Sequence, residues 1–344
     1  MLVSEFNYYL PQGLIAQVPL HKRDHSRMMI CDRDSGEIYH SHFFDIPKYF
    51  KKEDILVLNS SRVIPAKIWG KKEDGKSIEF LFLEEKDKNE WEVLCRPAKR
   101  IKLGDEISFA KDTFGQVVGI EPEGKRVIRF QHGEVFSFLK RAGYAPLPPY
   151  IKRKKGDLKF RVGDLDRYQT VFARKEGSIA APTAGLHFTQ ELLDKLKDKG
   201  VTICELSLDV GLATFQSVRV HNVEDYRMLT EKFVISKETA RDINNAIKAN
   251  HPVTAVGTTS VRALESAYEP GRVRSGQHTT DLFIFPGYPF KVIDRLLTNF
   301  HLPKSTLLML VSAFTGKDFI LKAYREAVRK KYRFYSYGDC MLIL

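Results

Sequence analysis

The segment of residues 296–316, LLTNFHLPKSTLLMLVSAFTG, constrains the fold of this chain more than any other feature. Its pattern predicts the end of an apolar strand, a polar turn, and then a helix of about ten residues that is apolar on all sides. A helix without a polar face must be buried, and this one is too short to cross a bilayer. Ser305 is placed to cap the start of the helix and Gly316 to end it.

A buried helix holds the turn in front of it on a rigid support. Asn299, His301, Lys304 and Ser305 stand in or beside that turn, next to the unpaired N–H groups of the first helical residues. The turn can therefore carry a functional site. The alternative is a core helix preceded by a solvated loop.

The net charge of the chain indicates which kind of molecule it binds. Over 344 residues, Lys and Arg number 55 against 43 Asp and Glu, which gives a formal net charge of +12. This surplus favours a polyanionic partner, either nucleic acid or an anionic membrane. No stretch is long and apolar enough to span a bilayer, and the first residues lack the layout of a signal peptide. We therefore expect a nucleic-acid partner and no membrane.

The four cysteines are scattered along the chain, at Cys31, Cys95, Cys204 and Cys340. Without a C-x-x-C pair, a zinc knuckle, thioredoxin chemistry and a cysteine-bound iron–sulfur cluster all lack their ligands. Few cysteines and no secretion signal fit a reducing cytoplasm.

The pattern of expected strands and helices changes at two points along the sequence, which suggests two domains. Residues 66–150 contain short alternating segments separated by turns, which is typical of a small all-β barrel. From residue 151 onward, strands alternate with helices. We expect the α/β class: a mixed α/β, barrel-like domain made of residues 1–65 and 151–344, with the β-barrel domain of residues 66–150 inserted into it.

Short motifs for common enzyme classes are absent or out of context. Residues 70–77 match the phosphate-loop pattern G-x-x-x-x-G-K-[ST], but the residues that follow are typical of a strand and not of a helix. We interpret this segment as the tip of a hairpin. The chain has no Gly-x-Gly, no H-E-x-x-H and no G-x-S-x-G, so an ordinary Rossmann dehydrogenase, a zinc protease and an α/β-hydrolase are disfavoured.

Three further segments, residues 180–189, 256–262 and 280–288, repeat the strand, polar turn and helix pattern or part of it. The small residues of the first allow another backbone or a ligand to approach closely. The hydroxyls and N–H groups of the second suit a carboxylate or phosphate, with Arg262 adding charge. The alternative for Arg262 is an ion pair with Glu265. In the third segment, Asp281 precedes a predicted apolar strand.

Basic residues gather in two runs. One contains Lys152, Arg153, Lys154 and Lys155, and the other ends the last predicted helix with Arg325, Arg329, Lys330 and Lys331 among several aromatic residues. Lys and Arg neutralise phosphates and aromatic rings can stack on unpaired bases, so both runs are candidates for RNA binding. The alternative is a pair of solvated faces.

Long motifs carry a family resemblance. They are LPPYIKR (147–153), RYQTVFARKEGSIAAPTAGLHFT (167–189), AVGTTSVRALES (255–266), TDLFIFPGYPFKVIDRLLTNFHLPKSTLLMLVSAF (280–314) and YRFYSYGDCMLIL (332–344). Together they resemble the S-adenosylmethionine:tRNA ribosyltransferase-isomerase family. NSSRVIPAK (59–67) and the N-terminal segment extend the resemblance over essentially the whole chain.

The resemblance implies a bacterial cytoplasmic enzyme of queuosine biosynthesis. Such enzymes use S-adenosylmethionine as a ribosyl donor and modify a 7-aminomethyl-7-deazaguanine at the wobble position of tRNA. The products are epoxyqueuosine in tRNA, adenine and methionine, and no metal is required. The family is built from an α/β domain with a β-barrel insertion. The partner we expect is therefore tRNA, and we expect the chain to act as a monomer.

The chemistry of this reaction suggests roles for residues in the retained motifs. His187 and His301 are the candidate acid and base, since they are the only histidines in those motifs, and Asp281 is a candidate for contacting the amine or the ribose. Candidates for substrate binding are Thr258, Thr259, Ser260 and Arg262, which would hold the methionine carboxylate, together with Asn299 and Thr183.

Four positions depart from the family pattern: Asp209 and Leu229 stand where family members usually have His, Ala213 where they have Gly, and Thr279 where they have Glu. These changes leave open a noncatalytic family member that only binds tRNA. A methyltransferase with the same cosubstrate is a second alternative, which the missing Gly-x-Gly disfavours.

Overall fold

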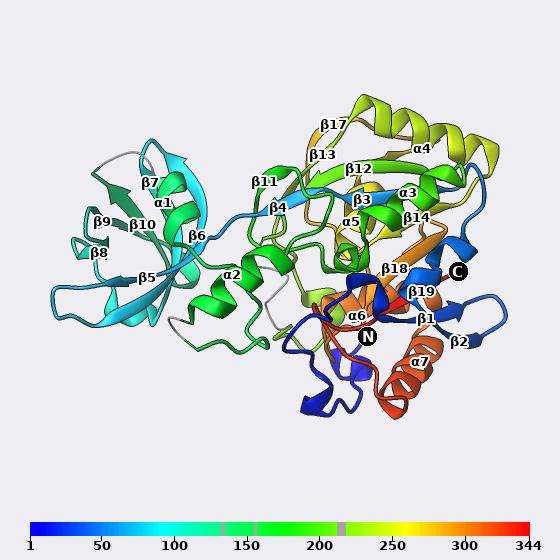
Figure 1. The fold of residues 1–344 in the computed structure, drawn as a ribbon, viewed down its shortest axis with the longest axis horizontal. Helices are drawn as coiled ribbons and strands as arrows, with labels where there is room; N and C mark the ends of the chain where they lie inside the picture. Colours follow the sequence, from blue (N-terminus) through cyan, green and yellow to red (C-terminus); the bar gives the residue numbers. More distant parts are fainter. Residues whose placement is uncertain (132–134, 155–156, 212–217) are drawn as a thin grey trace. The chain divides into compact units, whose positions relative to one another are not determined.

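The computed structural model describes residues 1–131, 135–154, 157–211 and 218–344 (Figure 1). The described residues divide into two compact units. The larger contains Met1–Arg62, Pro148–Lys152 and Gln169–Leu344, and the smaller contains Val63–Leu147 and Arg153–Tyr168. These units differ from the expected domains mainly at residues 153–168, which cluster with the barrel and not with the α/β unit.

The larger unit is built on a sheet in which nine strands of the described chain pair in the order β17-β13-β12-β3-β14-β18-β19-β1-β2. The strands are β1 (Arg27–Asp32), β2 (Glu37–His42), β3 (Ile55–Asn59), β12 (Thr202–Leu208), β13 (Glu231–Ile235), β14 (Val253–Val256), β17 (Gly276–Thr280), β18 (Arg295–Asn299) and β19 (Cys340–Ile343). The sheet ends at β17 and β2, so the barrel-like domain expected from the sequence is an open sheet. The α/β class itself is confirmed.

The central strands are parallel and buried on both faces. Strands β12, β3, β14 and β18 run parallel to one another, and every residue of β3 and β14 is buried. Near-continuous apolar strands of this kind require helices on both faces. On one face lie α4 (Lys237–Ala249), α5 (Thr258–Ala267), α6 (Thr306–Thr315) and α7 (Lys317–Arg329). On the other lies α3 (Gln190–Asp198).

Helix α6 has the properties predicted for residues 296–316. Ser305 caps it, since its Oγ accepts the N–H of Leu308 at 3.2 Å, and Gly316 follows it with a φ of 88°. Most of its side chains pack into the core of one face of the sheet. The turn in front of the helix therefore rests on a buried element, as expected.

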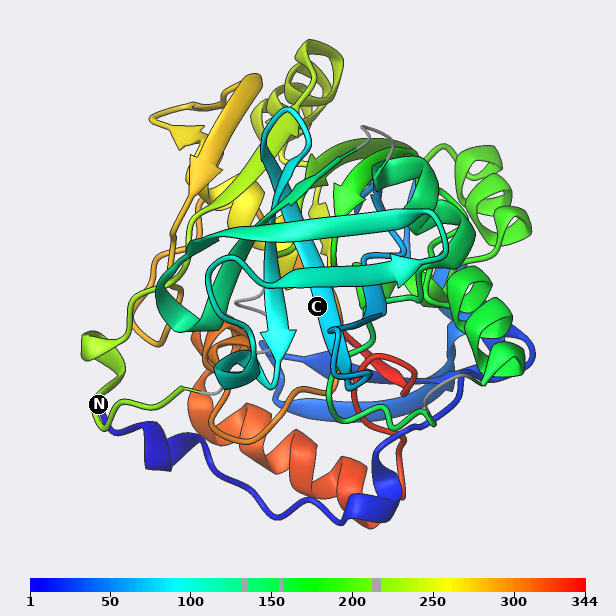
Figure 2. The same cartoon turned by 90° about the vertical axis from the view of Figure 1, so that its left-hand side faces the viewer.

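The smaller unit is a closed barrel of antiparallel strands in the order β10-β7-β6-β5-β8-β9 (Figure 2). The strands are β5 (Lys67–Lys71), β6 (Ser77–Asp87), β7 (Glu90–Arg96), β8 (Glu106–Ala110), β9 (Thr113–Ile120) and β10 (Lys125–Phe130), accompanied by α1 (Val135–Ala142) and α2 (Leu158–Arg167). The phosphate-loop lookalike is the tip of the β5–β6 hairpin, where Lys71 pairs with Ser77. The barrel predicted from short alternating segments is confirmed.

The shorter elements include β4 (Ser61–Val63), β11 (Lys175–Ser178), β15 (Tyr268–Glu269), β16 (Arg272–Val273) and the 3-10 helix η7 (Thr183–His187). In the residues that the structure describes, no helix combines the length and apolar character needed to cross a bilayer.

Candidate active site at one edge of the sheet

One edge of the nine-stranded sheet collects most of the residues singled out in the sequence. Parallel strands β12, β3, β14 and β18 end at this edge, and β19 and β1 begin there, because Cys340 pairs with both Asn299 and Met28. In open α/β sheets, ligands bind outside the carboxyl ends of the parallel strands. This edge is therefore the candidate site of the larger unit.

His187 is the centre of a buried hydrogen-bond network at this edge. Its Nδ1 lies 2.7 Å from Oγ of Ser26, and its Nε2 lies 3.2 Å from Nδ2 of Asn299. Thr183 donates its hydroxyl to Oδ1 of Asn299 at 2.7 Å, which fixes the orientation of that amide. Because the amide nitrogen can only donate, Nε2 of His187 accepts, and the ring proton belongs on Nδ1, facing Ser26.

The environment keeps the His187 imidazole neutral. Burial lowers its pKa to about 3, and the positive charges of Arg333 and Arg23 act in the same direction. A neutral imidazole is the form that accepts a proton. In this structure, however, the accepting nitrogen already receives the Asn299 amide, so that contact must open before His187 can take a proton from a substrate.

His301 lies on the opposite face of the sheet from His187. Its Nε2 lies 2.8 Å from Oγ1 of Thr298, the neighbour of Asn299 along β18. Successive side chains of a strand point to opposite faces, so Thr298 and Asn299 hold the two histidines apart. Burial also lowers the pKa of His301 to about 3. The structure thus does not bring the two candidate acid–base residues together.

Hydroxyl groups mark the start of α5, next to the end of β3. Thr258 and Ser260 are buried, and Oγ1 of Thr259 lies 3.5 Å from Nδ2 of Asn59. The Ser260 hydroxyl donates to the carbonyl of Val256 within the helix. Thr258 and Thr259, with the N–H groups of the first turn, are therefore better placed than Ser260 to meet a ligand.

Arg262 is buried and only partly paired. It forms an ion pair with Glu231, and its Nε donates to the carbonyl of Leu282 at 2.9 Å. Only 5% of the residue is exposed, and its Nη2 has no hydrogen-bond partner in the described part of the chain. The alternative pairing with Glu265 is wrong, because the Glu265 carboxylate accepts backbone N–H groups from residues 291–293.

Asp281 is exposed and follows β17 directly. The apolar strand expected after it does not form, and residues 282–285 are irregular. One reason is that the carbonyl of Leu282 is used by Arg262 and its N–H by Thr280, so neither is available to a strand partner. Asp281 shares the edge with Glu231, since Glu231 pairs with Thr280 across β13 and β17.

Each of the two basic runs contains one paired arginine and exposed lysines. Arg153 forms a two-point ion pair with Asp164, with nitrogen–oxygen distances of 2.7 and 2.9 Å. Arg329 is paired in the same way with Glu326. Lys152, Lys154, Lys330 and Lys331 have exposed side chains, and Lys155 lies outside the described residues.

Three of the positions expected to depart from the family pattern lie on or directly beside the neighbouring strands β12, β13 and β17. The N–H of Asp209 bonds to the carbonyl of Lys232, and Lys232 pairs with Thr279 across β13 and β17. Leu229 stands two residues before β13, and Ala213 lies outside the described residues. Oδ1 of Asp209 is buried and has no partner in the described chain, and burial raises the pKa of this carboxyl.

Four residues of the site were not anticipated from the sequence. They are Ser26, Asn59, Glu231 and Asp339; Asp339 contributes its carbonyl to Asn299 and its carboxylate to the backbone of Arg27. Asn59 and Asp339 carried a usable signal, since each is a polar residue at the end of an apolar strand. Ser26 and Glu231 had none.

The start of α5 offers groups that suit an organic anion. Arg262 has an N–H without a partner in the described chain, and hydroxyl groups stand in the first turn of the same helix; both kinds of group bind carboxylates. In the described residues, no group of three or more His, Cys, Asp or Glu side chains is placed to hold a metal ion.

Comparison with known proteins identifies the family. A family model described as queuosine biosynthesis protein matches residues 3–343. The S-adenosylmethionine:tRNA ribosyltransferase-isomerase of Clostridium kluyveri is 49% identical, with 100% of each chain covered, and that of Clostridioides difficile is 48% identical with the same coverage. The crystal structure of S-adenosylmethionine tRNA ribosyltransferase from Thermotoga maritima matches with a TM-score of 0.56 and 39% identity, covering 99% of this chain and 100% of that one. The chain therefore belongs to the queuosine biosynthesis family of transferases that its motifs predicted.

Proposed function

We propose that this chain transfers and isomerises the ribosyl group of S-adenosylmethionine onto 7-aminomethyl-7-deazaguanine at the wobble position of tRNA. The products would be epoxyqueuosine in tRNA, adenine and methionine. The main support is that relatives matching the whole chain at nearly half identity are named for this activity. The cytoplasmic location, the monomeric state and the absence of a metal requirement stay predictions.

The methionine part of the donor fits the start of α5. Its carboxylate would accept the free Nη2–H of Arg262 and hydrogen bonds from Thr258 and Thr259. The buried ion pair with Glu231 holds the guanidinium in place, so that it is oriented before the donor arrives. Ser260, Asn299 and Thr183 would contribute indirectly, by fixing the helix start and the His187 ring.

The proton transfers require a neutral base near the donor ribose. The sulfonium of S-adenosylmethionine acidifies the adjacent ribose carbon, so that removal of a proton there can start the loss of adenine. His187 is neutral and lies on the Asn299 face of β18, so we assign it this role ahead of His301. Asp281 is exposed at the same edge of the sheet and is the candidate for contacting the incoming amine.

The direct test is to incubate the protein with S-adenosylmethionine and an anticodon stem–loop that carries 7-aminomethyl-7-deazaguanine, and to analyse both by mass spectrometry. Release of adenine and methionine, with an RNA mass gain equal to the epoxycyclopentanediol group, is expected. Formation of S-adenosylhomocysteine would instead indicate a methyltransferase and would contradict the proposal.

A noncatalytic tRNA-binding role is the second candidate. It rests on the residues that differ from the pattern expected for the family, of which Asp209 and Thr279 both neighbour Lys232. In that case the RNA would bind, the donor would remain intact, and no adenine would be released at any donor concentration.

A further inference from the structure

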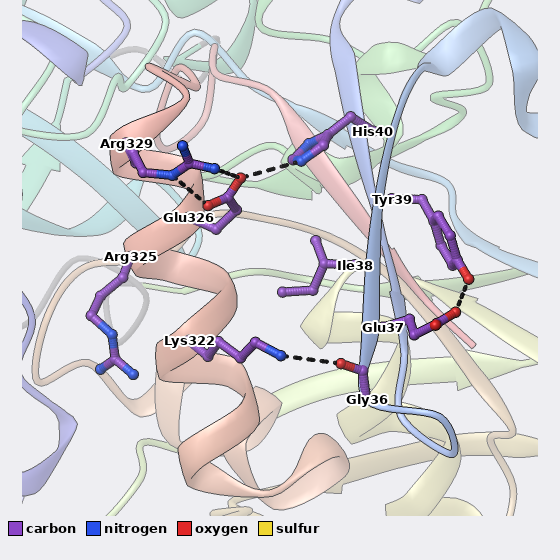
Figure 3. Close-up of a pocket in the computed structure, with 9 residues that line it drawn as sticks. All are labelled: Gly36, Glu37, Ile38, Tyr39, His40, Lys322, Arg325, Glu326 and Arg329. Atoms are coloured by element: carbon purple, nitrogen blue, oxygen red, sulfur yellow. Dashed lines mark hydrogen bonds and ion pairs between the residues drawn. The ribbon is translucent and has the colours of Figure 1, made fainter.

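A groove with a volume of about 560 Å³ lies between α7 and the edge strand β2 (Figure 3). Strand β2 pairs only with β1 in the described sheet, and the other wall of the groove is formed by Lys322, Arg325 and Arg329 of α7. These three cations stand at i, i+3 and i+7, which places them along one face of the helix. The groove belongs to the larger unit alone.

The charge of the groove is positive. Of its two carboxylates, Glu326 is paired with Arg329 and lies 3.5 Å from His40, and Glu37 accepts the hydroxyl of Tyr39. Lys322 and Arg325 are exposed and have no carboxylate partner in the described chain. Figure 3 shows the Arg325 side chain extending away from the strand, with no bond drawn to it. Lys322 donates to the carbonyl of Gly36 at 3.4 Å, a contact that leaves its charge without a counter-charge. Both cations can therefore attract an external anion.

The groove is linked to the candidate active site by an unbroken series of contacts. His40 bonds to the hydroxyl of Tyr332 at 2.8 Å, and the Arg27 guanidinium lies 3.9 Å from the centre of the Tyr332 ring. The backbone of Arg27 bonds to Asp339, whose carbonyl accepts from Asn299 beside His187.

The exposed Lys330 and Lys331 follow α7 at the same end of the groove, where their carbonyls accept the Arg27 guanidinium. Along α7, the exposed cations Arg329, Arg325 and Lys322 continue the series that begins with Lys330 and Lys331.

We infer that this groove binds the phosphodiester backbone of the tRNA anticodon stem while the wobble base is in the active site. The inference rests on the proposed function for the identity of the RNA. A regular series of cations on one helix face contacts consecutive phosphates and carries no base specificity. On the other wall of the groove, Ile38 and His40 point from β2 toward α7, while the Tyr39 ring points away from the helix (Figure 3).

The test is the affinity of a fluorescently labelled, unmodified anticodon stem–loop, measured by anisotropy at several salt concentrations. The double variant Lys322→Gln/Arg325→Gln removes two phosphate contacts. Each contact contributes about 0.7 to 0.9 to the slope of log K against log salt, so the slope should fall by roughly 1.4 to 1.8. At about 0.1 M salt this corresponds to a loss of affinity of roughly 25- to 60-fold.

The matched control is Lys237→Gln/Lys248→Gln, which removes two exposed charges from α4, a helix that packs on β12 and β14. It should retain the wild-type slope. An equal loss in both double variants would mean a nonspecific effect of net charge and would overturn the inference.

An unchanged slope in the α7 variant would also overturn the inference, because it would mean that Lys322 and Arg325 do not contact the phosphates of the RNA. The proposed function is tested separately by adenine release from the wild type. Wild-type RNA binding without adenine release would contradict the proposed function, while a reduced slope in the α7 variant would still support the groove.

Discussion

The Nδ2 atom of Asn299 lies 3.2 Å from Nε2 of His187, so the amide at the end of β18 occupies the one lone pair of a neutral imidazole. The same amide is held by Thr183 on its other side. The candidate base is thus oriented and at the same time blocked. Such an arrangement fits a site in which the substrate displaces an internal partner when it binds.

The first prediction compares the two buried histidines. His187→Gln should reduce the rate of adenine release by roughly 10²- to 10⁴-fold, which is the usual contribution of a general base. His301→Gln should change the rate much less, because His301 lies on the other face of β18. Both variants replace a buried ring, so they serve as controls for each other. Equal rates in the two variants would refute the assignment of His187.

The second prediction concerns stability at acid pH. The pKa of His187 is about 3 in the folded chain and near 6.5 when unfolded, so the unfolded chain takes up the proton first as the pH falls. The contribution of neutral His187 to the free energy of unfolding is therefore complete above pH 6.5 and is lost as the pH falls toward 3. Between about pH 6 and 4, the free energy of unfolding of the wild type should fall by about 1.4 kcal/mol per pH unit more than that of His187→Gln.

The measurement is urea denaturation of both proteins over that range. Buried carboxyls with raised pKa values, such as those of Asp209, Glu265 and Asp339, act in the opposite direction. Because they are common to both proteins, their contributions cancel in the difference. Parallel stability curves for wild type and His187→Gln would show that His187 is not buried in its neutral form.

Local patterns in the sequence were sufficient for the elements but not for the contacts of the site. The apolar helix α6 and its Ser305 cap follow from residues within four positions of each other, and the β5–β6 hairpin tip follows from the strand pattern after Ser77. By contrast, Arg262 meets Glu231 through the register of β12, β13 and β17, which no local pattern specifies.

His301 shows why a shared motif does not mean a shared site. Asn299 and His301 are two residues apart, a spacing that would place both on one face if the strand continued. The strand ends at Asn299, and the chain turns so that the His301 ring returns to Thr298. Long-range packing with Tyr8 and Tyr324, which bond to the His301 backbone, decides this turn.

The third prediction concerns the buried ion pair of Arg262. Glu231→Gln keeps an acceptor for the N–H of Gly211 but leaves a buried guanidinium without its counter-charge. Loss of one partner from a buried pair costs about 3–5 kcal/mol of unfolding free energy. Glu269→Gln, which weakens solvent-exposed pairs with Arg272 and Arg274, is the control and should cost less than about 1 kcal/mol. Urea denaturation at neutral pH separates the two, and equal losses would contradict the burial of the Arg262 pair.

The last prediction concerns Asp209, whose Oδ1 has no partner in the described chain and whose pKa is raised by burial. A carboxyl with a raised folded pKa favours folding most when it is protonated, and this contribution is lost as the pH rises through that pKa. Asp209→Asn should therefore stabilise the protein by about 1 kcal/mol at neutral pH and by nearly nothing near pH 4.

If the Asp209 carboxylate contacts the substrate, the same variant should also release adenine more slowly, since functional sites retain groups that cost stability. Thermal melts at both pH values, combined with the adenine assay, check both effects. A variant that is less stable than wild type at neutral pH would mean that the Asp209 carboxylate is paired within the protein and is not available to a ligand.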